Sequence, residues 1–565
     1  MNKELEKYLH LIKKNNVIKL NPNNISLGGF YLYLDIIAHK HSAYLLTPAR
    51  VQWEITQQCN LFCKQCYINS SHFCRKNELS TSDCLVLIEK LKKLNILWIE
   101  LQGGEPLIRK DFLIIINKIK KENLNVKIAT NGTLITEKIA MQLSNLLNPK
   151  TDSIQISLDG SNSKINDQIR GNGAFKKTIN GIRICKNIGL KYSINTTLMN
   201  ENISDIFNIY KLIHKIGGAD KFSFFTLMKV GRGKHQNFEF LEEGIRQYNK
   251  IKDFEKKVKK PSVIGYLGYE KHLPEYGKIA DKVFANNLPQ VRNRNSAAIS
   301  SMDIDCDGSV YPSSFLQLAE LNAGNIKSKS LNQLWNTSKW KTLREDSNKI
   351  SGKCLICNLY KFCGGGTLTN LYLYSKNHCF SDPQCLYTPV VKIDGVNLRP
   401  PRDNDLFFLA QLWGDSNVMK YVGYPHGMKI SRAKIAKWIN DWQKFGQLRL
   451  IIEDPAKNIP IGEIGYREDT KFPFKHRGKV LALDIKIIPE YWGRGIAKKS
   501  LKKFIEILSA NDKIEYFQVT PNVLNTGAIG LYHSLGFRKI GKIKTWIGQE
   551  GFKVKYRYMV LHLKN

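Results

Sequence analysis

Six short apolar segments between Val51 and about residue 235 alternate with amphipathic stretches, and this alternation constrains the fold most strongly. The segments are VQWEIT, ILWIELQGGEP, NVKIATNG, SIQISLDG, KYSINTTLM and KFSFFTLMKVGRG. The stretches between them have helical spacing, and in STSDCLVLIEKLKKL the residues Ser80 and Asp83 predict a capping box. Strands that alternate with helices predict a parallel sheet, curved or barrel-like, whose ligands bind in the loops after the strands.

Three cysteines, Cys59, Cys63 and Cys66, follow the first predicted strand in WEITQQCNLFCKQCYINSS. Three is an odd number, and the span is too short for a useful set of disulfides, so a metal is expected. The N-terminus lacks the order of a signal peptide, and no run reaches the roughly 18 apolar residues of a membrane span. We therefore expect a cytoplasmic protein without a membrane partner, in which clustered thiols bind metal or act in catalysis.

A second group of cysteines, which includes the CxxC pair Cys354 and Cys357, lies within residues 354–385. Two groups of soft ligands predict two iron–sulfur or zinc sites. The formal net charge of +37 suggests nucleic acid, because Lys and Arg neutralise phosphates. The lysines, however, are spread along the whole chain, without an arginine-rich arm or a basic run interleaved with aromatic residues. The sequence therefore favours an acidic peptide or acidic cofactor over nucleic acid.

The segment CNLFCKQCY, followed by LQGGEP, TNGT, ISLDG and DQIRGNGAF, resembles the radical S-adenosylmethionine (SAM) family. The resemblance implies an α/β fold, a partial (β/α)6 barrel similar to a TIM barrel, over residues 48–255. It also implies that the three cysteines hold a [4Fe–4S] cluster whose open iron binds SAM, the source of a deoxyadenosyl radical. The residues expected to bind SAM are Gly103, Gly104, Glu105, Asn131, Ser157, Asp159 and Arg170. Where the family usually has an aromatic residue before the third cysteine, this chain has Gln65.

The segment CLICNLYKFCGGGTLTNLYLYSKNHCFSDPQC, with MDIDCDGSVYPSSF upstream, resembles SPASM, the auxiliary-cluster domain of radical SAM enzymes that mature peptides. The resemblance implies a small cysteine-rich α+β domain over residues 285–388. Ser313 and Thr367 stand where the family pattern has cysteines, so one auxiliary [4Fe–4S] cluster is expected in place of two. A structural zinc site is the alternative. The expected ligands are Cys354, Cys357, Cys363 and Cys385, with Cys379 as the alternative to Cys385.

Residues 390–565, which contain no cysteine, resemble a GNAT N-acetyltransferase with an α+β fold. The strand VLALDIKII turns through WGRGIA into an amphipathic helix, and a glycine turn that opens a helix binds anions. The resemblance implies that the pyrophosphate of acetyl-CoA contacts Gly493, Arg494, Gly495, Ile496 and Ala497. It places Asn525 near the pantetheine arm and makes Tyr532 the acid that protonates the departing thiolate. Glu463 and Asp484, on neighbouring predicted strands, are the candidate bases.

These features predict a bifunctional enzyme. Its radical SAM half would modify a ribosomally synthesised peptide, and its acetyltransferase half would N-acetylate an amine on the same product. The expected partners are a precursor peptide or small amine and an electron donor such as ferredoxin or flavodoxin. One alternative is RNA or tRNA modification, because the catalytic subunit of Elongator also joins radical SAM to a GNAT-like domain. The other is dehydrogenation and N-acetylation of a small molecule such as an aminoglycoside. Residues 1–47 form an N-terminal extension without a predicted role.

Overall fold

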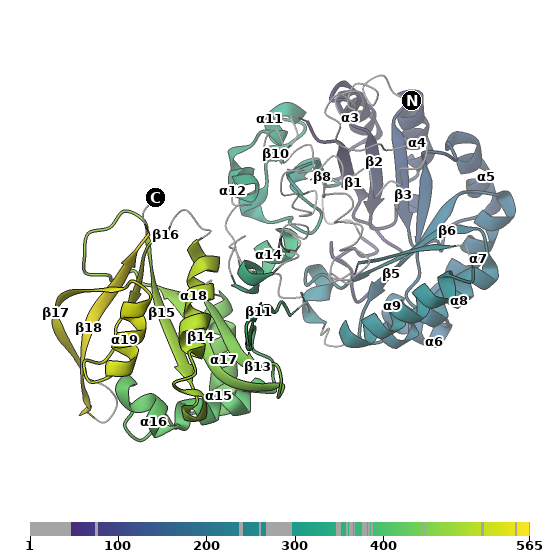
Figure 1. Cartoon of the computed structure of the whole chain (residues 1–565). Coiled ribbons are helices and arrows are strands. Elements are labelled where there is room, and N and C mark those ends of the chain that lie inside the picture. The colour runs from purple at the N-terminus through teal and green to yellow at the C-terminus, as the bar shows by residue number, and fades with distance from the viewer. Residues whose placement is uncertain are drawn as a thin grey trace, which may run out of the picture. The chain divides into compact units, whose positions relative to one another are not determined.

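A computed structural model gives the fold of most of the chain, which divides into two compact units (Figure 1). The described residues are 44, 47–73, 77–236, 241–258, 261–266, 297–345, 352–357, 360, 365–366, 368–375, 381, 385, 388–444, 447–509, 514–547 and 551–563. Predictions that concern residues 1–43, Cys363, Thr367 and Cys379 lie outside these residues. The first unit contains the described residues within Met1–Asn348, Lys361–His378 and Asp382–Leu386, and the second contains the others.

Six parallel strands that alternate with helices form the centre of the first unit. The strands are Arg50–Thr56 (β1), Trp98–Gly103 (β2), Asn125–Thr130 (β3), Ser153–Ser157 (β4), Tyr192–Leu198 (β5) and Ala219–Thr226 (β6). The connecting helices are Thr81–Lys93 (α3), Phe112–Lys121 (α4), Glu137–Leu146 (α5), Ser163–Arg170 (α6), Ala174–Ile188 (α7) and Ile206–Ile216 (α8). They cover the outer side of the curved sheet (Figure 1). This arrangement confirms the predicted α/β class and the partial six-stranded barrel.

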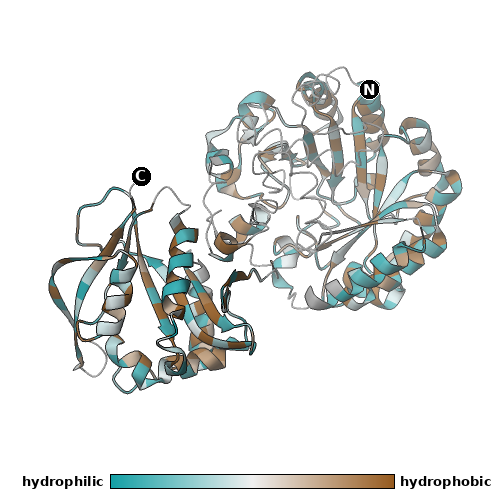
Figure 2. Cartoon of the chain, viewed as in Figure 1, coloured by the Kyte–Doolittle hydropathy of each residue, from teal (hydrophilic) through white to brown (hydrophobic). Residues whose placement is uncertain are grey.

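The alternation of apolar residues explains why these segments form strands beneath helices. In β1, Val51, Trp53 and Ile55 are fully buried in the core, while the residues between them face the other side of the sheet. Figure 2 shows hydrophobic and hydrophilic residues mixed along each covering helix, as expected for helices with one buried face. Helix α3 begins with the predicted capping box, in which Ser80 and Asp83 each bond the other's backbone N–H.

Strands beyond the six extend the same sheet at both edges. They are Ser262–Tyr266 (β7), Ser301–Ile304 (β8), Ser309–Tyr311 (β9) and Gly324–Asn325 (β10). Strand β7 pairs in parallel with β6, and β8 pairs in parallel with β1. The segment MDIDCDGSVYPSSF contains the antiparallel hairpin of β8 and β9. Its union with the barrel sheet was not predicted, because a parallel partner far away in the chain leaves no local pattern. The other helices of this unit are Leu241–Glu255 (α9), Leu331–Trp335 (α11), Lys341–Glu345 (α12) and Leu368–Ser375 (α14).

The second unit is built on an eight-stranded sheet in the order β11-β12-β13-β14-β15-β16-β18-β17. Its strands are Val391–Ile393 (β11), Val396–Arg399 (β12), Leu448–Asp454 (β13), Ile459–Glu468 (β14), Lys479–Ile487 (β15), Ile514–Val519 (β16), Arg538–Ile547 (β17) and Lys553–His562 (β18). Its helices are Asp405–Gly414 (α15), Ser416–Met419 (α16), Arg432–Lys444 (α17), Ile496–Ser509 (α18) and Thr526–Ser534 (α19). Helix α18 connects β15 to β16, which form the one parallel pair among the described strands of this sheet. Within the described residues, β16 pairs with only the first half of β15, from Lys479 to Ala482.

None of the helices within the described ranges has the length and apolar character that crossing a bilayer requires.

A short 3₁₀ turn, Gly352–Ile356 (η9), belongs to the second unit, where it contacts α18 and β13. Ile356 is 7% exposed and belongs to the same core as Leu398 and Leu450. The first part of the CxxC region therefore adds to this core, although the sequence expectation grouped it with residues 285–388.

We expect Ile356→Ala to lower the free energy of unfolding of the second unit by ~2–5 kcal/mol, because it leaves a cavity in the core. Thermal unfolding and hydrogen exchange on the full chain measure the effect. In the control Ile459→Ala, the replaced side chain is 40% exposed in the same unit, so stability should change by less than about 0.5 kcal/mol. Equal effects of the two substitutions would show that η9 does not stabilise this unit.

Candidate functional site

The three cysteines of CNLFCKQCY lie on one irregular loop after β1. Cys59 is buried, and Cys63 and Cys66 are half-buried. The backbone N–H of Cys59 donates to the carbonyl of Ser71 at 2.8 Å. Burial raises the pKa of the Cys59 thiol to about 12 and also raises the pKa of Cys63. A bound metal must therefore supply the positive charge that ionises these thiols.

Among the described residues, no three His, Cys, Asp or Glu side chains form a group that could hold one metal ion. Three thiolates are the ligands that a [4Fe–4S] cluster with one open iron takes, each at a separate iron. That Cys59, Cys63 and Cys66 hold such a cluster stays a prediction.

The two glycines of LQGGEP bring the loop after β2 against the backbone that leads to Cys59. Gly103 has a φ of +139°, and a Cβ there would lie 2.3 Å from the carbonyl oxygen of Thr56. A Cβ on Gly104 would lie 2.0 Å from the carbonyl oxygen of Gln58. In the described structure these two glycines thus allow the two backbone segments to approach each other closely. Their contact with SAM stays a prediction.

Glu105, the next residue, has a completely buried side chain. Its carboxylate accepts hydrogen bonds from Thr130 Oγ1 at 2.7 Å, the Asn131 N–H at 2.7 Å and the Leu107 N–H at 3.2 Å. Burial raises the pKa of this carboxyl group. Glu105 therefore joins the loop after β2 to the loop after β3, and its expected contact with the ammonium group of SAM stays a prediction.

Asn131, at the end of β3, positions the first cysteine. Its Nδ2 donates to Asn60 Oδ1 at 2.9 Å and lies 3.9 Å from Cys59 Sγ. Its Oδ1 accepts from the N–H of Thr133 at 2.9 Å. The motif TNGT thus contacts the cysteine loop directly, although β2 lies between β1 and β3 in the sheet.

Asp159 and Arg170, which come from separate motifs, form an ion pair with Arg170 Nε 2.7 Å from Asp159 Oδ2. Asp159 is fully buried, and its other oxygen accepts from the Thr197 N–H at 2.8 Å. Burial raises the pKa of Asp159, and the charge of Arg170 opposes this rise. Gln65 Nε2 donates to Asp159 Oδ2 as well. Ser157, at the end of β4, is half-buried.

Arg232 was not singled out from the sequence, although the structure gives it several contacts with the cysteine loop. It lies in the 3₁₀ turn Gly231–His235 (η4) after β6. Its backbone N–H donates to the Cys66 carbonyl at 2.9 Å, and Nε donates to the Cys63 carbonyl at 2.8 Å. Nη1 donates to the Ser70 carbonyl at 2.7 Å, and the guanidinium lies 3.9 Å from the ring centre of Phe62.

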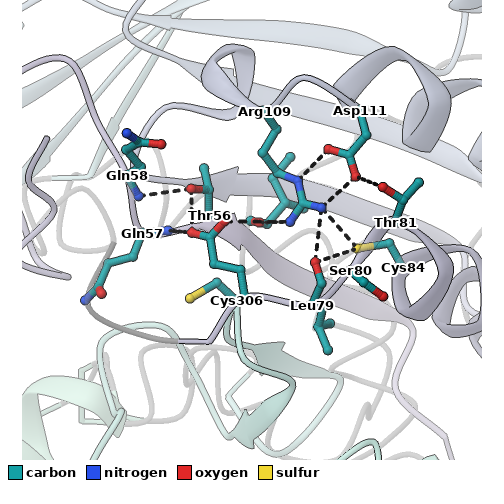
Figure 3. Close-up of polar contacts among 12 residues, drawn as sticks. Thr56, Gln57, Gln58, Leu79, Ser80, Thr81, Cys84, Arg109, Asp111 and Cys306 are labelled. Carbon is teal, nitrogen blue, oxygen red and sulfur yellow. Dashed lines mark hydrogen bonds and ion pairs between the residues drawn. The ribbon is translucent and has the colours of Figure 1, made fainter. Parts of the chain in front are cut away.

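A second arginine that the sequence did not reveal, Arg109, fixes the end of β1 (Figure 3). Its Nη1 donates to the Ile55 carbonyl at 2.7 Å, and its Nη2 donates to the Leu79 carbonyl at 3.2 Å and to Asp111 Oδ2 at 2.7 Å. The N–H of Leu79 donates to the carbonyl of Cys306 in the β8–β9 turn at 2.7 Å. Arg109 thus joins the strand before the cysteine loop to the segment that contacts the hairpin.

The candidate auxiliary ligands are only partly described. Cys354 and Cys357 lie in the second unit, and Cys385 lies in the first. The N–H of Cys354 donates to Ser381 Oγ at 3.2 Å. Ser313, which replaces a cysteine of the family pattern, is buried and accepts from a backbone N–H two residues later. The four-ligand set stays a prediction, since other candidates lie outside the described residues.

The WGRG turn at the start of α18 has the properties of an anion site. Gly493 and Gly495 have φ values of +73° and +74°, and no described atom lies within 4 Å of an ideal Cβ on either. Their backbone conformation requires glycine, and the space around them is open. Arg494 lies with its guanidinium 4.8 Å from the ring centre of Tyr491. The turn opens a helix of 14 residues, so free N–H groups and the helix dipole favour a pyrophosphate there.

The second acetyltransferase motif lies on α19. Asn525 caps this helix, because its side chain accepts from the N–H of Ala528 at 3.0 Å. Tyr532 is buried beside Phe537, with the two ring centres 5.8 Å apart. Burial and then the charge of Asp484 raise the pKa of Tyr532, so the phenol is protonated at neutral pH. A protonated phenol is what a leaving-group acid requires.

Both candidate bases are paired with cations. Glu463 is buried and accepts from Trp413 Nε1 at 2.8 Å, and Arg449 and Lys486 lie 3.1 and 3.2 Å from its Oε1. Asp484 is more exposed and pairs with the same two cations. Although burial opposes it, Lys486 and then Arg449 lower the pKa of Asp484. A carboxylate held ionised in this way is a weak base, so the role of either residue as a base stays a prediction.

We expect Arg232→Met to weaken cluster retention, because it removes two charged hydrogen bonds worth ~1.5–3 kcal/mol each from the cysteine loop. Iron per chain after anaerobic reconstitution should fall several-fold, and Arg232→Lys should recover part of it. The control is Arg246→Met, which changes a side chain that is 71% exposed. Full iron content and unchanged thermal stability in Arg232→Met would refute this role.

We expect Lys486→Met to lower the free energy of unfolding of the second unit by ~1–3 kcal/mol at neutral pH, because it removes one of the two cations that pair with the buried Glu463 while Arg449 remains. The pKa of Asp484 is lowered by folding, so its stabilisation is present above the ordinary carboxyl pKa and is lost as pH falls. The difference from the unsubstituted protein should therefore shrink below about pH 4, as denaturation at several pH values would show. Lys499→Met, which breaks an exposed pair with Asp394, should cost less than about 1 kcal/mol.

Family models match three regions of the chain. They are the radical SAM superfamily at residues 53–213, the SPASM iron–sulfur cluster-binding domain at residues 297–358 and the GNAT acetyltransferase domain at residues 396–538. SAM and iron–sulfur clusters are the cofactors of the first two domains, and acetyl-CoA is that of the third.

Known proteins also resemble a large part of the chain. An AdoMet-dependent heme synthase of Methanosarcina barkeri is 27% identical over 352 residues, which cover 60% of this chain and 97% of that protein. Mycofactocin maturase MftC of Mycolicibacterium smegmatis is 27% identical over 363 residues, 63% of this chain and 88% of that protein. The crystal structure of Streptococcus suis SuiB bound to S-adenosylmethionine has a TM-score of 0.53 at 19% identity, and the match covers 68% of this chain and 88% of SuiB. The chain is therefore an enzyme that joins a radical SAM domain and a SPASM domain to a C-terminal GNAT acetyltransferase domain.

Proposed function

We propose that this enzyme matures a ribosomally synthesised peptide in two reactions, a radical modification and an acetyl-CoA-dependent N-acetylation of an amine on the same product. The observation that carries the proposal is the presence of both catalytic domains in one chain. Fusion of two activities is favourable when they share a substrate, because the second reaction then takes place at a high effective concentration.

The names of the relatives suggest two classes of substrate for this enzyme, a peptide and a tetrapyrrole. One relative is named as a maturase, and SuiB has also been crystallised with its precursor peptide SuiA, a structure with a TM-score of 0.51 at 19% identity. Other relatives are named heme synthases. A tetrapyrrole macrocycle has no aliphatic amine that an acetyltransferase could modify, whereas every peptide has an N-terminal amine and many have lysines. The GNAT domain therefore favours the peptide over the tetrapyrrole.

Residues of this chain are proposed to bind each cofactor. Cys59, Cys63 and Cys66 would hold the cluster that binds SAM, and bound SAM supplies the radical chemistry. The WGRG turn would hold the pyrophosphate of acetyl-CoA. We further propose one auxiliary [4Fe–4S] cluster that passes electrons. Its proposed ligands are Cys354, Cys357, Cys363 and Cys385.

Electrons would come from a ferredoxin or flavodoxin in the cytoplasm. These carriers are acidic, and a chain with a formal net charge of +37 attracts them from solution. Reduction should accordingly slow as salt is added, since screening weakens this attraction.

Mass spectrometry of peptides encoded near this gene and co-expressed with the full chain tests the proposal. We expect a product with both a radical-dependent mass change and one acetyl group. Cys63→Ala should remove the radical change, and Tyr532→Phe should slow acetylation about a hundredfold or more while acetyl-CoA still binds. Unmodified peptides, together with tRNA that changes in mass, would favour RNA modification and contradict the proposal.

A further inference from the structure

Gln65, which stands directly before the third cysteine, has an amide whose orientation is fixed. Its Nε2 donates to Asp159 Oδ2 at 2.5 Å. A carboxylate only accepts hydrogen bonds from an amide, so the nitrogen must face Asp159 and the oxygen must face away from it. The position of Oε1 follows from this contact.

The Gln65 Oε1 atom is buried and has no hydrogen-bond partner among the described residues. Leaving such an atom unsatisfied is costly, and native structures usually fill such positions with a ligand or water. A vacant acceptor thus lies next to Asp159 and beside the cysteine loop.

The two buried carboxylates of this site do not offer a comparable acceptor. Glu105 accepts three hydrogen bonds from protein groups, and both oxygens of Asp159 have protein partners. Of these three side chains, Gln65 is the one with a buried oxygen that has no hydrogen-bond partner among the described residues. The ligand of a radical SAM domain at its cysteine loop is SAM.

We propose that Gln65 Oε1 accepts a hydrogen bond from bound SAM, so that in this chain an amide acceptor stands where the family usually has an aromatic ring. The donor is an N–H or O–H group, which SAM carries both on its nucleoside and on its methionine part. The proposal depends on SAM as the cofactor and is independent of which substrate is modified.

Isothermal titration of SAM into the anaerobically reconstituted full chain tests the proposal through binding. Gln65→Met removes both the donor and the acceptor of the amide, whereas Gln65→Lys keeps a donor toward Asp159, removes the acceptor and adds one positive charge. Both variants should bind SAM about ten- to a hundredfold more weakly, the effect of leaving a buried hydrogen bond unmade. The control Gln142→Met changes an exposed glutamine on α5 and should leave the affinity unchanged.

Two ligand fragments identify the donor. If 5′-deoxyadenosine binds more weakly to Gln65→Lys while methionine does not, the donor lies on the nucleoside; the reverse result places it on the methionine ammonium. Unchanged SAM affinity in Gln65→Lys would overturn the proposal, even if Gln65→Met binds more weakly, because only the contact with Asp159 would then matter. Iron content and thermal stability without SAM show whether each variant still folds and carries its cluster.

Discussion

The cysteine loop carries the three proposed cluster ligands and has no regular secondary structure of its own, so its surroundings must fix its backbone. Groups from several strand ends provide this restraint. Arg232 bonds two carbonyls of the loop from the end of β6, Asn131 reaches Cys59 from β3, and Arg109 holds the end of β1. These contacts are partly or fully buried, so the loss of a partner leaves a polar group that water satisfies only in part. The barrel thus acts as a frame that preorganises the loop for its cluster.

In the acetyltransferase domain, the main electrostatic feature is a group of paired charges. Its sheet carries two carboxylates and two cations close together near Tyr532, and the buried charges balance. Although burial opposes them, Lys486 and Arg449 hold the pKa of Asp484 below its ordinary value, while burial raises the pKa of the Tyr532 phenol and keeps it protonated at neutral pH. The proposed role of Tyr532 as the acid requires this protonated state. The lowered pKa makes Asp484 a weak base, and its role as the base stays a prediction.

Local patterns in the sequence predicted the parts of the fold that depend on neighbours in the chain. The six strands of the barrel follow from apolar alternation, and the capping box of Ser80 and Asp83 follows from helix-start chemistry. Long-range contacts left no such signal. The pairing of β8 with β1, the burial of Ile356 in the second unit and the clamp of Arg232 all join segments that are distant in the chain. The motifs likewise identified Glu105 but not that protein donors occupy its carboxylate.

The account depends most on the claim that Cys59, Cys63 and Cys66 hold a cluster with one iron open to SAM. Electron paramagnetic resonance of the reduced full chain, recorded with and without SAM, tests it directly. We predict that SAM changes the spectrum of the unsubstituted protein and of Cys354→Ala, because the cluster of the cysteine loop is intact in both. In Cys63→Ala, SAM should change nothing. A spectrum that SAM leaves unaltered in the unsubstituted protein, or still alters in Cys63→Ala, would contradict the account.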